Sequence, residues 1–313
     1  MPGTGGNGRG AGSKVLLIFL DGVGLAPEGP DNPLSTVPMP RLRCLLDGPM
    51  VLGGARVHPG HRRPSELVFR GVDACLGVPG LPQSATGQTA LFTGINAPAL
   101  VGEHITAYPT QSLRELIARH SLLRRAAESG ARVLFANAHS EHFWQMVRDG
   151  QRSLSASTLT ALAAGAPIPT LDDLRLGRAV LWDITHEIAS GYLGYALPMV
   201  TAEEAGTRLA RLAAEYDLVL YETFLPDLAG HRRLAPEWVL PRLDAFLGAV
   251  LECRALECTV VVCSDHGNIE DARTKLHTDN PVPLLAFGPR AECFRQVTAI
   301  TGVAPAILEA LTH

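Results

Sequence analysis

The sequence predicts an α/β fold, with a mostly parallel central sheet that is flanked by helices. Three short aliphatic runs, at 15–20, 218–221 and 260–262, have the length and composition of strands. They lack the polar alternation of a half-exposed strand, so we expect them to be buried on both faces, as in parallel sheets. Segments with helical spacing lie between them, which favours strands joined through helices.

The composition is that of an ordinary globular protein. The chain has 313 residues, of which 46% are hydrophobic and 19% charged, and its formal net charge is -4. This charge gives no electrostatic reason to expect a nucleic acid or an anionic membrane as partner. The six cysteines form no CxxC pair, the N-terminus lacks the apolar core of a signal peptide, and no apolar run approaches the roughly 20 residues that span a bilayer. We therefore expect a cytoplasmic protein with reduced thiols.

The chain is expected to consist of three parts: a disordered tail (1–13), a discontinuous core (14–98 and 206–313) and a smaller inserted unit (99–205). The tail is rich in glycine and has no apolar periodicity. The inserted unit ends where glycine and proline cluster, and a capping pattern at Thr201, Glu203 and Glu204 then begins a new helix. Apolar spacing predicts helices at 85–92, 112–129, 155–165, 201–216, 236–252 and 301–313, and a further strand at 131–140.

Polar side chains follow the first predicted strand and begin the first predicted helix. Asp21 comes directly after the strand at 15–20, where an aspartate is more often a turn former or a helix cap than a ligand. Ser84 lies at the start of the helix at 85–92, where free backbone amides and the helix dipole favour negative charge. Its hydroxyl is either a helix cap, which the local sequence favours, or a nucleophile that carries a phosphoryl group.

Two more polar clusters follow the other predicted strands. Asp227 and His231 lie four residues apart after the strand at 218–221, where a solvated loop is the alternative. Asp265 and His266 end the run that contains 260–262, and His277 lies eleven residues beyond His266. A strand followed by a polar turn is the alternative there. Aspartate and histidine together are ligands of hard or borderline metal ions.

These positions converge at one edge of a parallel sheet, because the carboxyl ends of its strands lie side by side. Seven oxygen and nitrogen ligands suit two divalent ions better than one. The seven side chains are Asp21, Ser84, Asp227, His231, Asp265, His266 and His277.

The order of these motifs resembles the alkaline phosphatase superfamily. The motifs are DGVG, a serine before a glycine-containing helix, D-x-x-x-H, DHGN and HTDNPVP. The resemblance of the core covers roughly two thirds of the chain. Within the superfamily these motifs resemble most the metalloenzyme branch, which contains cofactor-independent phosphoglycerate mutase and phosphopentomutase. The resemblance implies an alkaline phosphatase-like core, with residues 99–205 as a smaller inserted α/β cap.

The resemblance also implies roles for single residues. One metal ion would be held by Asp227, His231 and His277, and a second by Asp21, Asp265 and His266. Ser84, three residues before Gly87, would bridge toward the metals as the nucleophile, with Thr86 as the fallback. Where the family has a histidine after that glycine, this chain has Gln88, which departs from the pattern.

The implied activity is two-metal phosphoryl transfer to and from a small phosphorylated metabolite through a phosphoserine. Ligands of this kind, without cysteine, fit Mn²⁺ or Zn²⁺. A closing cap would exclude water and favour a phosphomutase. A phosphatase or phosphodiesterase of the same superfamily is the alternative, and a catalytically silent metal-binding protein is the alternative of another class. The lysine that phosphoglycerate mutases carry near the second hinge has no counterpart, which argues against that enzyme itself.

The substrate-binding candidates lie in one polar stretch of the insertion. Arginine forks suit phosphate, although arginines in loops are usually only solvated. The candidates are Arg148, Arg152, His139, His142 and Asn137.

Overall fold

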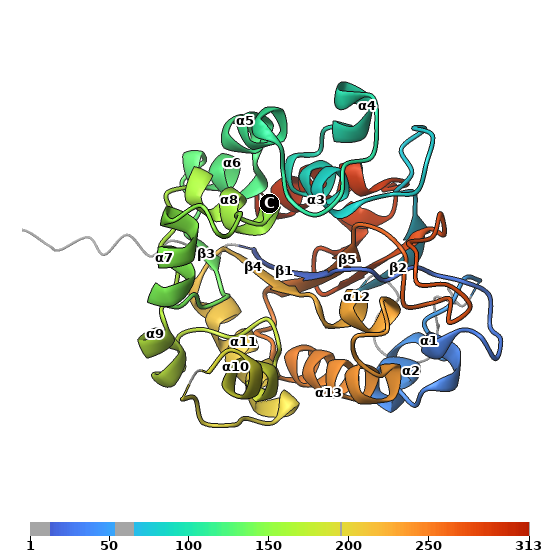
Figure 1. Cartoon of the computed structure of the whole chain (residues 1–313). Helices are drawn as coiled ribbons and strands as arrows, with labels where there is room; N and C mark the ends of the chain where they lie inside the picture. Colours follow the sequence, from blue (N-terminus) through green and yellow to red (C-terminus); the bar gives the residue numbers. More distant parts are fainter. Residues whose placement is uncertain (1–12, 54–65, 195, 313) are drawn as a thin grey trace, which may run out of the picture.

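A six-stranded sheet with the strand order β2-β6-β5-β1-β4-β3 runs through the centre of the molecule (Figure 1). The computed structural model describes residues 13–53, 66–194 and 196–312, so the predicted tail lies almost wholly outside the described residues. The strands are β1 (Lys14–Leu20), β2 (Leu67–Val72), β3 (Val133–Phe135), β4 (Leu218–Thr223), β5 (Cys258–Ser264) and β6 (Val282–Phe287).

The four strands β5, β1, β4 and β3 are parallel, and β6 pairs with β5 and with β2 in antiparallel fashion. β1 lies at the centre, and every residue of β4 and β5 is buried. The register places Leu20 opposite both Thr223 and Ser264. The next residues of β1 and β5, Asp21 and Asp265, therefore leave the sheet at the same edge, as the sequence predicted.

Helices cover both faces of the sheet (Figure 1), which confirms the predicted α/β fold. One layer contains α3 (Ser84–Thr93), α4 (Ala97–Val101), α5 (Gln111–His120), α6 (Leu122–Glu128), α8 (Ala156–Ala163) and α14 (Val303–Thr312), with the short turns η1 (Ala291–Phe294) and η2 (Ile300–Gly302). The other layer contains α1 (Pro33–Thr36), α2 (Pro40–Leu46), α11 (Ala202–Glu215), α12 (Leu225–Gly230) and α13 (Pro236–Cys253). The helices α7 (Glu141–Arg148), α9 (Leu171–Arg175) and α10 (Glu187–Tyr192) lie beyond the β3 edge or beside α11.

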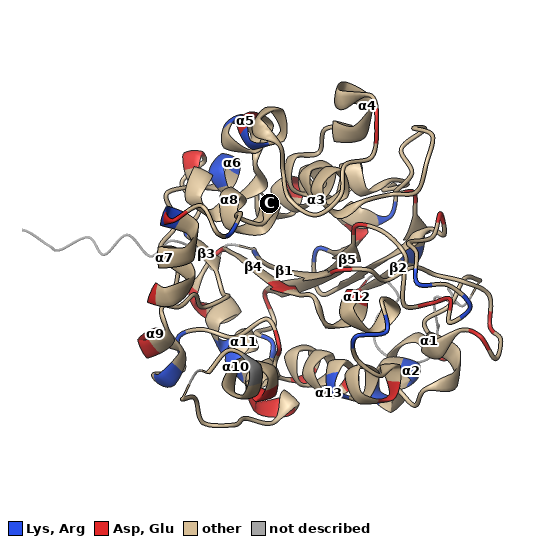
Figure 2. Cartoon of the chain, in the orientation of Figure 1, with Lys and Arg blue, Asp and Glu red and all other residues tan. Residues whose placement is uncertain are grey.

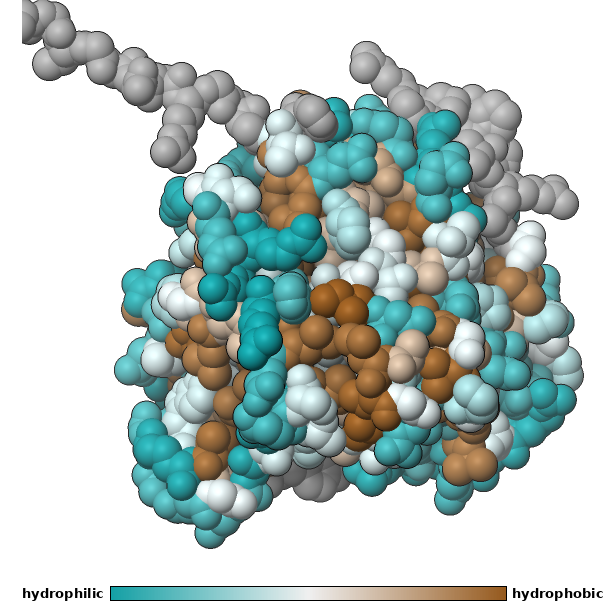
Figure 3. Space-filling model, turned by 90° about the horizontal axis from the view of Figure 1, so that it is seen from above, coloured by the Kyte–Doolittle hydropathy of each residue, from teal (hydrophilic) through white to brown (hydrophobic). Residues whose placement is uncertain are grey.

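Two apolar clusters form the core, one on each face of β1. Alternate residues of this strand divide between them: Leu17 and Phe19 join one cluster, and Leu16 and Ile18 join the other. Seen from above, the first helical layer carries a hydrophobic area bordered by hydrophilic side chains (Figure 3). Leu100 of α4 and Leu162 of α8 are exposed large apolar residues of this layer. None of the helices in the described part of the chain combines the length and hydropathy that a bilayer crossing requires.

The segment 99–205 shares the central sheet with the rest of the chain. Its strand β3 pairs in parallel with β4, from Val133 opposite Leu218 to Phe135 opposite Leu220. Only three residues of the strand expected at 131–140 form it. The expected helix at 112–129 is divided into α5 and α6, because Ser121 has an extended conformation and its buried hydroxyl donates to the carbonyl of Thr160. The boundaries of an inserted cap stay a prediction.

Two glycines let the polar loops approach one another. Gly22, directly after Asp21, has φ of +74°, and a Cβ atom there would lie 2.8 Å from the Cα of Asp227. Gly87 in α3 packs on Asp265, whose backbone oxygen would lie 2.9 Å from an added Cβ. Both distances are shorter than a carbon atom tolerates, so glycine at these positions brings three segments together.

Replacing Gly87 by alanine tests this packing. In an open helix the change would stabilise the protein by up to about 1 kcal/mol. Here we expect it to lower the free energy of unfolding by about 1–3 kcal/mol, because α3 must move away from Asp265. Gly191→Ala in α10 is the control, because nothing lies within 4 Å of its added Cβ. Urea unfolding curves in which the two variants are equally stable would contradict the close contact.

Candidate metal centre and active site

The structure gathers the seven predicted side chains at the carboxyl edge of the sheet. Asp21 follows β1, and Asp265 and His266 follow β5. Asp227 lies in α12, and His231 is the residue at the end of that helix. His277 lies in the loop before β6, and Ser84 is the first residue of α3. Figure 2 shows acidic segments beside β1, β5 and α12, while basic residues are scattered over the helices around them.

The first group of candidate ligands is buried. The Nε2 atom of His266 lies 3.2 Å from Asp21 Oδ1 and 3.6 Å from Asp265 Oδ2. Both of these carboxylate oxygens are buried and have no hydrogen-bond partner. Buried polar atoms are nearly always paired in native proteins. The two unpaired carboxylate oxygens therefore fit a bound cation.

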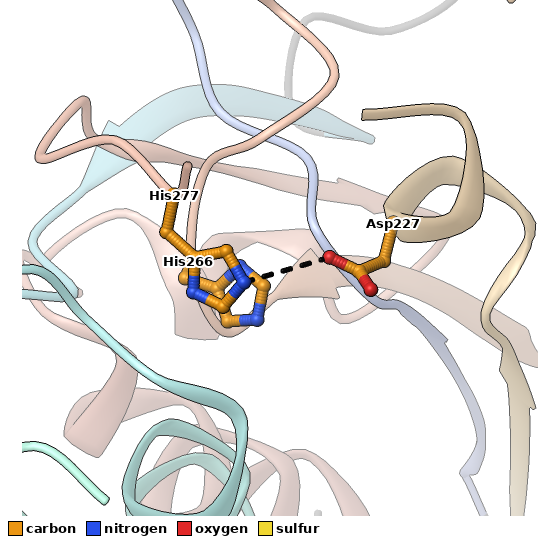
Figure 4. Close-up of side chains that lie close together, drawn as sticks. All are labelled: Asp227, His266 and His277. Carbon is orange, nitrogen blue, oxygen red and sulfur yellow. Dashed lines mark ion pairs between the residues drawn. The ribbon is translucent and has the colours of Figure 1, made fainter. Parts of the chain in front are cut away.

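The second group places two imidazoles and a carboxylate within a few ångströms. His231 Nε2 lies 3.4 Å from Asp227 Oδ1, and His277 Nε2 lies 3.7 Å from the same oxygen. The two Nε2 atoms lie 3.4 Å apart. Figure 4 shows His277 facing Asp227, with the ring of His266 stacked against it at a centroid distance of 3.7 Å.

The tautomers of these imidazoles explain why a cation fits between them. His231 Nδ1 lies 2.8 Å from the carbonyl oxygen of Lys275, and His277 Nδ1 lies 2.9 Å from that of Pro82. A carbonyl oxygen only accepts hydrogen bonds, so both Nδ1 atoms carry the proton. In the neutral rings both Nε2 atoms then present lone pairs to each other and to Asp227. A divalent cation bound by all three atoms would remove this repulsion.

His266 lies between the two groups. Asp227, His266 and His277 each offer one ligand atom within 4.8 Å of the others, as do Asp21, Asp265 and His266. The resemblance assigned His266 to the group of Asp21. The geometry places His266 within reach of both groups, so the two groups of candidate ligands adjoin at this residue.

The pKa shifts describe a site with surplus negative charge. Burial raises the pKa of Asp265 well above its usual range. The charge of His266 lowers this pKa, whereas the carboxylates of Asp21 and Asp227 raise it further. Burial opposes a charge on His266, but the surrounding carboxylates outweigh it and raise the pKa to about 10. Burial, then the charge of His266, lowers the pKa of His277 to about 4. His277 is therefore neutral near pH 7, the form that binds metals.

Two further side chains support the ligands, and our sequence interpretation did not single them out. The Nδ2 group of Asn268 donates to Asp227 Oδ1 over 2.9 Å. Glu270 is buried and accepts from the backbone amides of Gly24 and Asn268, at 2.9 and 2.8 Å, and from the hydroxyl of Thr278. Both lie in the DHGNIE stretch directly after Asp265 and His266, which was the available signal.

Ser84 is the hydroxyl that faces the candidate ligands. Its Oγ atom lies 3.0 Å from His266 Nε2, at the N-terminus of α3. Thr86, the fallback, is fully buried; its hydroxyl donates to the Gln83 carbonyl and accepts from the amide of Ile105. Gln88, the departure from the family pattern, lies near Asp265, and its side chain lowers the pKa of that carboxyl against the larger effect of burial. The geometry favours Ser84.

A cavity of about 690 Å³ opens beside the site, and Asp21, Ser84 and Asp227 are among its lining residues. Four of the five substrate-binding candidates line it as well: Asn137, His139, His142 and Arg152. Arg148 is not among the described lining residues, because it pairs with Glu141 and Gln145 on exposed α7.

Two lining residues have their polar atoms engaged within the protein. The amide of Asn137 bonds at both ends to the backbone of Glu222, which makes it a sheet contact. His139 lies 3.0 Å from the hydroxyl of Thr158, and burial lowers its pKa. Glu222 also lines the cavity and was not predicted. Burial raises its pKa to about 8, although Ser157 donates to it. A glutamate at the end of a buried strand was the signal for this residue.

Replacing Asn268 by alanine tests the metal centre without removing a candidate ligand. We expect divalent-ion affinity to fall roughly 10- to 100-fold, because Asp227 loses the donor that orients it. Titration calorimetry with Mn²⁺ or Zn²⁺ measures the change. Asn96→Ala is the control, since its side chain caps α4 and donates to Leu76. Wild-type affinity in both variants would contradict a role of Asp227 as ligand.

Comparison with known proteins supports this reading of the site. Residues 185–313 match the family model of the Metalloenzyme superfamily. The chain is similar to the 2,3-bisphosphoglycerate-independent phosphoglycerate mutase of Paracoccus denitrificans, with 34% identity over 125 residues. It is also similar to the enzyme of the same name from Vibrio vulnificus, with 28% identity over 141 residues. These alignments cover 36% and 42% of this chain but only 24% and 26% of those proteins, about a quarter of their length.

The whole chain resembles the structure of the PH0037 protein from Pyrococcus horikoshii. That alignment covers 97% of this chain and 98% of the other, with a TM-score of 0.56 and 15% identity, which shows a shared fold. The matched family region contains five of the seven candidate side chains. Asp21 and Ser84 lie outside this region, at the end of β1 and the start of α3, and the fold brings them to the site. The family match and the mutase relatives confirm the resemblance of this chain to the metalloenzyme branch, which its motif order indicated.

Proposed function

We propose that the protein is a metal-dependent phosphoryl-transfer enzyme that acts on a small phosphomonoester through a phosphoserine at Ser84. The observation that carries the proposal is the position of the Ser84 hydroxyl. It lies at a helix N-terminus, 3.0 Å from His266, beside two adjoining groups of candidate metal ligands. The relatives named phosphoglycerate mutase support a phosphorylated metabolite as substrate.

The residues present fit two divalent cations, proposed as Mn²⁺ or Zn²⁺. One would be held by Asp227, His231 and His277, and the other by Asp21, Asp265 and His266, with Ser84 between them. When bound, such ions supply positive charge that lowers the pKa of the serine hydroxyl and stabilises the transferring phosphoryl group.

The chain itself contributes positioning and a favourable field. Ser84 is the first residue of α3, so the helix dipole favours the negative charge of a phosphoryl group on it. The amides of Ala85 and Thr86 donate to the carbonyl of Ile105, so this contribution comes from the dipole. Asn268 orients Asp227, and the carbonyl oxygens of Lys275 and Pro82 hold the two imidazoles with Nε2 toward the site. These contacts fix the ligands before substrate binds, which reduces reorganisation during transfer.

We propose a phosphomutase as the first assignment, because part of the segment 99–205, including α7, lines the cavity over Ser84 and would limit access of water. A phosphatase or phosphodiesterase is the alternative. The exposed cavity residues His142, Arg152 and Arg233 favour it, since they leave the entrance open to solvent.

All six cysteines are free thiols, and a cytoplasmic location stays a prediction.

The test is turnover of 4-nitrophenyl phosphate by the protein loaded with Mn²⁺ or Zn²⁺. We expect Ser84→Ala to lower kcat by ~10³-fold or more, since the nucleophile is lost. Mass spectrometry after an acid quench should find phosphate on Ser84 in the wild type. Ser129→Ala, which removes an exposed hydroxyl at the end of α6, is the control and should keep full activity.

The outcomes separate the alternatives. Equal activity of Ser84→Ala and wild type would remove Ser84 from its role. Metal binding without turnover in either protein would favour a silent metal-binding protein. Stoichiometric release of inorganic phosphate from a natural monoester would identify a hydrolase, whereas transfer between two hydroxyls of the same substrate without release would identify a mutase.

A further inference from the structure

The cavity beside Ser84 has aromatic side chains that the proposed chemistry does not use. We call these four residues the aromatic wall: Tyr108, Phe143, Trp182 and Phe224. They come from four separate segments, namely the connection between α4 and α5, helix α7, the connection between α9 and α10, and the residue that precedes α12. Aromatic residues make up only 5% of the chain, so their convergence on one cavity is informative.

The rings of the aromatic wall are not packed away in the core. Tyr108 is 42% exposed, and Phe143, Trp182 and Phe224 are only half-buried. The rings of Trp182 and Phe224 lie 6.0 Å apart at an angle of 49°. Leu193, another lining residue, is 43% exposed. Apolar surface that is left open inside a concave site is a common feature of ligand-binding pockets.

Several of the polar groups that line the cavity have hydrogen-bond partners within the protein. His139 lies 3.0 Å from the Thr158 hydroxyl, which lies 2.9 Å from that of Ser155. Glu222 accepts a hydrogen bond from Ser157. A phosphorylated sugar or sugar acid would need several free donors and acceptors for its hydroxyls. The groups that are bonded in this way are not free for such hydroxyls.

The phosphate has its own place in the cavity, apart from the aromatic rings. Among the described residues that line the cavity, the Lys and Arg side chains are Arg152 and Arg233, and both are exposed. The guanidinium of Arg152 lies 5.8 Å from the centroid of the Phe143 ring. At this distance the guanidinium interacts with the ring of Phe143 as well as contributing positive charge to the cavity. The metal-ligand cluster at Ser84 is the part of the cavity that suits a phosphate.

We propose that the aromatic wall binds a planar, apolar ring on the alcohol side of the phosphomonoester, while the phosphate lies at Ser84. This inference rests on the proposed function and names its substrate class. The ring can belong to a nucleoside or to an aralkyl alcohol, because both join a planar group to phosphate through a short linker. A cavity of about 690 Å³ accommodates either size.

The test compares three esters with primary alkyl leaving groups, so that leaving-group acidity does not decide the result. They are 2-phenylethyl phosphate, adenosine 5′-monophosphate and glycerol 3-phosphate, assayed with the Mn²⁺-loaded protein. We expect kcat/KM for at least one ring-bearing ester to exceed that for glycerol 3-phosphate by on the order of 10-fold or more. A preference for adenosine 5′-monophosphate identifies a nucleoside substrate, and a preference for 2-phenylethyl phosphate identifies an aralkyl substrate.

Variants of the aromatic wall connect the preference to these residues. Trp182→Ala and Phe143→Ala should each lower kcat/KM for the preferred ring ester by on the order of 3- to 10-fold and leave glycerol 3-phosphate nearly unchanged. Leu100→Ala removes an exposed apolar side chain on α4 that does not line the cavity, and it should change neither value. Phe143 lies on exposed α7, so its variant remains informative if Trp182→Ala fails to fold.

Binding of phosphonates tests the role of the aromatic wall by a measurement that does not depend on turnover. We expect 2-phenylethylphosphonate to bind more tightly than ethylphosphonate by calorimetry, with the difference lost in Phe143→Ala. Equal binding of the two phosphonates, or equal kcat/KM for all three esters with turnover intact, overturns the proposed role of the aromatic wall. Either result leaves the proposed function standing. Tight ring binding without turnover or phosphoserine supports the wall and overturns the proposed function.

Discussion

The rest of the site depends on the need to neutralise negative charge and lone pairs at one edge of the sheet. Three carboxylates, Asp21, Asp227 and Asp265, lie together with little solvent around them. Two imidazole nitrogens, from His231 and His277, point at each other and at one of these carboxylates. Such an arrangement is costly in a protein that binds no cation. It is favourable where divalent ions are held.

The fold supplies this arrangement through the parallel register of β1, β4 and β5. Because Leu20 lies opposite Thr223 and Ser264, the residues after each strand emerge at one edge. Gly22 and Gly87 then remove the side chains that would keep the loops apart. Ser84 reaches the cluster because α3 packs directly on the loop of Asp265. Stability and chemistry thus share the same few contacts.

Much of this core could be predicted from the sequence, because its signals are local. A buried parallel strand is a short aliphatic run without alternation, as in Val260–Val262, and the polar residue after it must lie at the sheet edge. The seven side chains met as expected. The capping pattern at Thr201 was also confirmed, with Glu204 completing the capping box.

Other features of the structure depend on contacts between distant segments. Three residues of β3 complete the sheet only because β4 lies beside them, so residues 99–205 could not be recognised as sharing the sheet. Arg148 looked as suitable as Arg152, but it pairs with Glu141 and is not among the described residues that line the cavity. The aromatic wall has no sequence signal at all, since its rings come from four segments with no common pattern.

The central claim is that this edge of the sheet holds a pair of divalent cations. Anomalous X-ray scattering from crystals of the Mn²⁺- or Zn²⁺-loaded protein tests it most directly. The account predicts two peaks, one in contact with Asp21, Asp265 and His266 and the other with Asp227, His231 and His277, with the Ser84 hydroxyl beside both. No peak at these residues, or ions bound only elsewhere on the protein, would contradict it.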